Sequence, residues 1–191
     1  GGGARRGRRA LHGRESVSGE RRPGDPRAEW LRARFHRVFG PRDLPVPVDA
    51  IAADLLGLFV ADVDGLGVSG ALLPHERRVL LNAAESRQSP QRRRFTLAHE
   101  IGHWVCQCDE GRAPAPAILC RSADIDTTGG RDLEREANVF AAELLMPEPL
   151  VRREVARGRS RDELAALFAV SEPAMGWRLF NLGLGARPEE G

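Results

Sequence analysis

Two histidines and a glutamate form the pattern His99-Glu100-Ile101-Gly102-His103, inside a stretch with helical periodicity. In a helix, this spacing places both imidazoles on one face, one turn apart, where they can bind the same metal ion. Glu100 lies beside the two histidines but is not one of the expected ligands, so it is the candidate general base. The pattern therefore predicts the HExxH centre of a metallopeptidase.

A zinc hydrolase of this kind needs a third protein ligand and an open coordination position for water. The helical stretch 131–146 offers three glutamates. On a helical wheel, Glu134 shares the apolar face with Ala137, whereas Glu136 and Glu143 fall on the opposite, solvent-facing side. A carboxylate on the buried face is costly unless it is paired or bound to a metal. We therefore expect Glu134 to be the third ligand.

Asn138 lies one helical turn after Glu134. Metal-bound histidines usually donate their second ring nitrogen to a neighbouring polar group. Asn138 is predicted to be such a partner for one of the two histidines.

This ligand set predicts amide hydrolysis. Zinc would lower the pKa of a bound water, and Glu100 would accept its proton and pass it to the leaving amine. The chain contains no Tyr, so the donor to the developing oxyanion must be His75, an Arg, a backbone amide, or nothing beyond the zinc ion.

Two segments resemble those of a known family. They are RFTLAHEIGH at residues 94–103 and EREANVFAAELLMP at residues 134–147. Their order and spacing are similar to those of the ImmA/IrrE family of metallo-endopeptidases, and the resemblance extends more loosely over residues 28–185. It implies a zincin-like fold, Zn²⁺ held by His99, His103 and Glu134, and Glu100 as the catalytic base. It also implies an intracellular enzyme that cleaves a helix-turn-helix repressor and so derepresses genes.

The elements that must position these residues predict an α+β fold. Helices are expected at about 28–39, 49–57, 89–107 and 131–146, and strands at 58–63, 68–73 and 78–82. The strands are predicted to form a small antiparallel sheet, and 108–130 a long loop. The strand 78–82 is either a sheet edge that binds an extended peptide substrate or an ordinary core strand.

The chain is expected to divide into three parts. Residues 1–26, rich in Gly, Arg and Pro, are predicted to be a disordered basic tail. Residues 27–147 would form the zincin-like peptidase domain, and 148–191 a helical, helix-turn-helix-like segment packed on it, with Ser160 and Glu163 as a capping box.

Charge and composition narrow the range of functions. The net charge is only +2, and the excess of Arg lies at the N-terminus. No apolar run approaches the roughly 20 residues of a membrane span, and no signal peptide is evident, so a cytoplasmic protein is expected. Three cysteines, Cys106, Cys108 and Cys120, do not suggest a disulfide framework, and Cys106 is either inert or a reactive thiol near the metal.

One alternative belongs to a different class of function. The same scaffold could act as a regulatory module that binds DNA or another protein without proteolysis, through the basic tail or the C-terminal helices. The charge excess of those helices is small, and their large side chains are mainly suited to packing. We therefore expect a protein substrate as the partner of the peptidase core, and no contact with a membrane.

Overall fold

The computed structural model describes residues 25–42, 44–108, 117–120 and 131–188. The expected tail, except for its last two residues, and most of the expected loop lie outside these ranges. The described helices, short helical turns (η) and strands are, in chain order, α1 Pro26–Phe39, α2 Val48–Ala50, η1 Ile51–Leu55, β1 Phe59–Val63, β2 Gly70–Leu73, η2 Pro74–Glu76, β3 Arg78–Asn82, α3 Ala83–Gln88, α4 Pro90–His103, η3 Trp104–Cys108, β4 Ile118–Cys120, α5 Arg131–Leu145, α6 Glu148–Ala156, α7 Arg161–Phe168 and α8 Glu172–Asn181. The α+β class is thus confirmed.

Local sequence signals account for most helix ends. The Ser89 side chain caps α4 and Pro90 is its first residue, as predicted. The predicted capping box of Ser160 and Glu163 begins α7. Helix α1 begins at Pro26, because the Asp25 side chain accepts a hydrogen bond from the backbone of the first turn.

The sheet is mixed, so the prediction of an antiparallel sheet is wrong in part. Its strand order is β1-β3-β2-β4. Strand β2 is antiparallel to both β3 and β4, but β1 is parallel to β3. The alternation of side chains identifies a strand without encoding its partner, and β1 pairs with the second strand of the β2–β3 hairpin instead of the first.

Strand β3 lies inside the sheet, between β1 and β2. This position contradicts the suggestion that 78–82 is an edge free to bind a peptide. One edge of the described sheet is β4, a strand of three residues within the segment that we expected to be a loop. Such a short strand has too few residues to show a period in the sequence.

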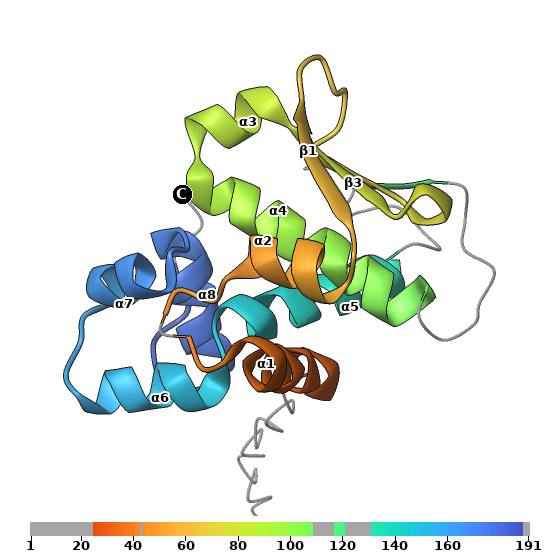
Figure 1. Cartoon of the computed structure of the whole chain (residues 1–191). Helices are drawn as coiled ribbons and strands as arrows, with labels where there is room; N and C mark the ends of the chain where they lie inside the picture. The colour runs from red at the N-terminus through yellow and green to blue at the C-terminus, as the bar shows by residue number, and fades with distance from the viewer. Residues whose placement is uncertain (1–24, 43, 109–116, 121–130, 189–191) are drawn as a thin grey trace, which may run out of the picture.

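Helix α4 lies between the sheet and α5 (Figure 1). It packs on β2 and β3 on one side and on α5 on the other, while α1 contacts α5. The largest buried side chains of this core are Phe140, Phe168, Leu31, Ile51, Leu58, Leu72, Leu81, Leu97, Ile101, Leu144, Leu145 and Met146. In the part of the chain that the structure describes, no helix combines the length and apolarity that crossing a bilayer requires.

A buried ion pair attaches α8 to α5. The Arg178 guanidinium binds the Glu143 carboxylate, and its Nε donates to the carbonyl oxygen of Met146 at 2.9 Å. Glu143 is only 5% exposed, so our expectation that it faces solvent is wrong. The helical wheel of α5 identified the polar side correctly, but α8, distant in sequence, covers part of that side. The division of the chain between residues 147 and 148 stays a prediction.

Candidate metal centre

Helix α4 holds His99 and His103 in the core, with 3% and 0% of their surfaces exposed. Their rings meet edge to face, with centroids 4.6 Å apart. The two Nε2 atoms are 2.9 Å from each other. Four residues of α-helix are enough to produce this arrangement, because they bring the second side chain back over the first.

Helix α5 brings Glu134 to the two imidazoles. Its Oε2 lies 3.0 Å from Nε2 of His99, and its Oε1 lies 3.2 Å from Nε2 of His103. One ligand atom from each of the three residues lies within 4.8 Å of the other two. The structure therefore brings together the three residues that we expected to hold a metal, and two imidazole nitrogens with one carboxylate match the donor set that zinc accepts.

An amide side chain contacts Nδ1 of each histidine. Nδ1 of His99 is 3.0 Å from Oδ1 of Asn138, the partner expected from the sequence. Nδ1 of His103 is 2.6 Å from Nε2 of Gln107, a residue that the sequence analysis missed. A signal for Gln107 was present, because it follows His103 by four residues on the same helical path.

Glu100 is fully buried on α4. Neither of its carboxylate oxygens has a hydrogen-bond partner among the described residues. Strand β2 closes over it at Gly70, where an added Cβ would lie 2.6 Å from Oε1 of Glu100. Two unsatisfied buried oxygens beside a cluster of metal-binding donors fit a site where a cation and a reacting water would complete the interactions.

The electrostatics of the two carboxyl groups differ. Burial, followed by the nearby charge of Glu134, raises the pKa of Glu100 well above its ordinary value. Partial burial would also raise the pKa of Glu134, but hydrogen bonds to His103 and His99 outweigh it and lower that pKa to about 2. Glu134 is thus ionised as a ligand must be, and Glu100 binds a proton more readily, as a general base must.

Two of the candidate oxyanion donors, His75 and Arg77, lie at η2. His75 lies exposed in η2, as expected of a loop histidine. Arg77 of the same turn is already engaged, since its side chain donates to the carbonyl oxygens of Leu56 and Gly57.

The cysteines near the centre differ in exposure. Cys106 is buried in the core cluster, and the Sγ of Cys108, which is partly exposed, lies 3.9 Å from the carbonyl oxygen of His103. The side chain of Cys120 lies outside the described residues.

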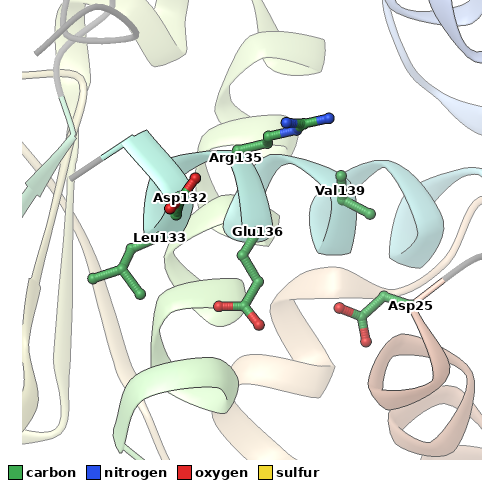
Figure 2. Close-up of a pocket in the computed structure, with 6 residues that line it drawn as sticks. All are labelled: Asp25, Asp132, Leu133, Arg135, Glu136 and Val139. Carbon is green, nitrogen blue, oxygen red and sulfur yellow. The ribbon is translucent and has the colours of Figure 1, made fainter. Parts of the chain in front are cut away.

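A surface pocket of about 370 Å³ lies beside the first half of α5. Its lining residues are Asp25, Asp132, Leu133, Arg135, Glu136 and Val139 (Figure 2). They include none of the residues of the metal cluster. Glu136 accepts a hydrogen bond of 2.7 Å from Arg27 of α1 and is 36% exposed. None of the residues to which we assign chemistry therefore lines this pocket.

Comparison with known proteins finds relatives among the metallopeptidases. The family model of the IrrE N-terminal-like domain matches residues 60–180. The radiation response metalloprotease IrrE of Deinococcus radiodurans is 39% identical over 111 residues, which cover 53% of this chain and 30% of IrrE. The metallopeptidase ImmA of Bacillus subtilis is 24% identical over 132 residues, or 68% of this chain and 73% of ImmA.

A solved structure shows a related fold. A transcriptional regulator of Mycobacterium tuberculosis superposes with a TM-score of 0.58 at 20% identity, over 82% of this chain and 47% of that protein. The chain thus spans less than a third of IrrE and about half of the regulator. The family model covers well over half of the chain and includes every residue of the cluster, so the chain belongs to the ImmA/IrrE family of metallopeptidases.

Proposed function

We propose that this chain is an intracellular zinc-dependent endopeptidase of restricted specificity with a zincin-like fold. Its substrate would be a transcriptional repressor of the helix-turn-helix class, whose cleavage derepresses genes. One observation carries the proposal. The buried, unpartnered carboxylate of Glu100 lies on the helix whose two imidazoles converge with Glu134.

His99, His103 and Glu134 are the proposed zinc ligands. A bound zinc ion would supply a Lewis acid that makes water more acidic and polarises a carbonyl oxygen. Asn138 orients His99, since its Oδ1 accepts the Nδ1–H hydrogen bond and leaves Nε2 free to bind.

Glu100 is the proposed general base. Its carboxylate would accept a proton from the attacking water and donate it to the nitrogen of the leaving amine. The close packing around the Glu100 carboxylate supports this role. The approach of Gly70 leaves no room for a side chain beside Oε1, and burial removes competing hydrogen-bond donors. The carboxylate is therefore held in a site where its basicity exceeds that of an exposed glutamate.

The repressor substrate rests on the family resemblance. The C-terminal helices are proposed to cover the peptidase core or to hold the substrate protein. The buried contact between Arg178 and Glu143 supports this assignment, because it attaches α8 to the same helix that carries Glu134. A helix-turn-helix repressor encoded beside this gene is the first substrate to test.

The decisive experiment is Glu100→Gln. The variant should bind about one zinc ion per chain, as the wild type does, but should lose cleavage of the repressor. Glu136→Gln on α5 is the matched control, and it should keep both properties. Cleavage that persists in Glu100→Gln would reject the mechanism, and a wild-type protein without zinc would reject the site.

A further inference from the structure

The helical turn that follows α4 places the side chain of Gln107 next to His103. Residues Trp104–Cys108 form a π-helical turn that continues from His103. Within this turn, Nε2 of the Gln107 amide lies 2.6 Å from Nδ1 of His103. Such turns are rare within helices and are frequent at functional sites, where they redirect a side chain.

We propose that Gln107 is a positioning residue that fixes the tautomer and orientation of His103 for metal binding. Neutral imidazole carries one proton, on either Nδ1 or Nε2. Nε2 of His103 faces Nε2 of His99 and the Glu134 carboxylate, so it is the nitrogen that must be free to bind a cation. The proton must then be on Nδ1, which needs a hydrogen-bond acceptor.

In the proposed arrangement, the Gln107 amide turns its oxygen toward Nδ1 of His103, in place of the Nε2 atom that faces Nδ1 in the structure, and so supplies that acceptor. The two ends of a glutamine amide exchange by a half-turn of its last torsion, so the Nδ1–H group of His103 selects the end that accepts. The contact involves a ring with no exposed surface. Because bulk water does not reach that ring directly, loss of the amide leaves Nδ1–H without a good partner and favours the other tautomer, whose proton blocks Nε2.

In this arrangement, each of the two histidines has its own hydrogen-bond acceptor at Nδ1. His99 receives its acceptor from Asn138 on the neighbouring helix, whereas His103 receives its acceptor from the next turn of its own helix. Assembly of α4 against α5 is needed for the first contact but not for the second. Gln107 thus orients His103 through local structure, and Asn138 orients His99 through tertiary structure.

The inference rests on the metal-binding part of the proposed function and not on cleavage. Its test is the zinc affinity of Gln107→Leu, measured by competition with a chromogenic chelator. We expect about 10- to 100-fold weaker binding than in the wild type. Gln107→Glu retains an acceptor and should restore binding, and Gln91→Leu, at an exposed position of α4, is the matched control.

A second measurement separates hydrogen bonding from electrostatics and from folding. In ¹⁵N-histidine-labelled protein loaded with zinc, the Nδ1–H resonance of His103 should be present in the wild type and in Gln107→Glu, and should be lost or shifted in Gln107→Leu. The metal-free forms should all remain folded at the temperature of the measurement. Equal zinc affinity of wild type and Gln107→Leu would overturn the inference while leaving the proposed function intact, whereas a wild type that binds no zinc would overturn both.

Discussion

Gly102 on α4 lies directly against Ala137 on α5. A Cβ added to Gly102 would be 3.1 Å from both the Cα and the carbonyl oxygen of Ala137. On α4 this contact lies between His99 and His103, and on α5 it lies between Glu134 and Asn138, the partner of His99. The separation of the two backbones therefore sets the distance from Glu134 to the imidazoles.

The first prediction concerns this contact. Gly102→Ala should destabilise the protein by about 1–3 kcal/mol, because the new methyl group meets backbone atoms that cannot give way. It should also weaken zinc binding, because α5 must move away with Glu134. Urea unfolding and chelator competition test the two effects. Gly67→Ala, where an added Cβ has no atom within 4 Å, is the control, and equal stability of the two variants would contradict the prediction.

The second prediction concerns the wall beside the proposed base. In Gly70→Ala, the new Cβ would lie 2.6 Å from Oε1 of Glu100 and 2.7 Å from Cγ2 of Thr96. The carboxylate must shift, and a misplacement of about 1 Å can lower the catalytic rate about 100-fold. The zinc content should remain near that of the wild type. Full activity in Gly70→Ala would show that the position of Glu100 is not restricted by β2.

The third prediction concerns the ion pair between Glu143 and Arg178. Arg178→Met should lower the free energy of unfolding by about 3–5 kcal/mol, because it leaves a buried carboxylate unpaired. The double variant Glu143→Leu/Arg178→Met should recover much of that loss, since both charges are then absent. Denaturant unfolding of the wild type, both single variants and the double variant measures the coupling. Additive losses in the double variant would argue against a direct pair.

The fourth prediction concerns pH and the metal-free protein. Because the pKa of Glu100 is raised in the native state, the native state binds more protons than the unfolded state above about pH 4.5, the ordinary range of a glutamate. Stability from this group is therefore fully present below that range and is lost as pH rises through the native pKa. Metal-free Glu100→Gln should be more stable than the wild type at neutral pH.

Urea unfolding with a chelator present, repeated from pH 4 to pH 8, measures this difference. The advantage of Glu100→Gln should shrink toward pH 4. Glu29→Gln, at an exposed position of α1, should show little change across the same range. A stability difference between Glu100→Gln and the wild type that is constant with pH would mean that Glu100 is not responsible for it.

The metal-binding pattern of α4 could be predicted from the sequence because it is local. One turn of helix relates His99 to His103, and no other part of the chain is needed to place them together. The choice of Glu134 over Glu136 and Glu143 required a second step, the apolar face of another helix, and the structure brings that residue to the imidazoles. Gln107 obeys the same local rule, since it follows His103 by four residues, but no motif marks it as a histidine partner.

The sequence was less informative wherever an element met a distant partner. Glu143 is on the polar side of its helix, yet α8 covers it and Arg178 compensates its charge. Likewise, strand β3 lies inside the sheet because β1 pairs with it in parallel. Neither contact has a counterpart in local periodicity.

The sequence by itself determined the metal-binding spacing, the boundaries of the main helices and the family. These depend on residues a few positions apart, whose relation is set by backbone geometry and capping. Tertiary structure decided the direction of β1, the burial of Glu143 and the isolation of the Glu100 carboxylate. Each of these results from close approach between segments far apart in the chain, where packing against a specific neighbour overrides the pattern of either segment alone.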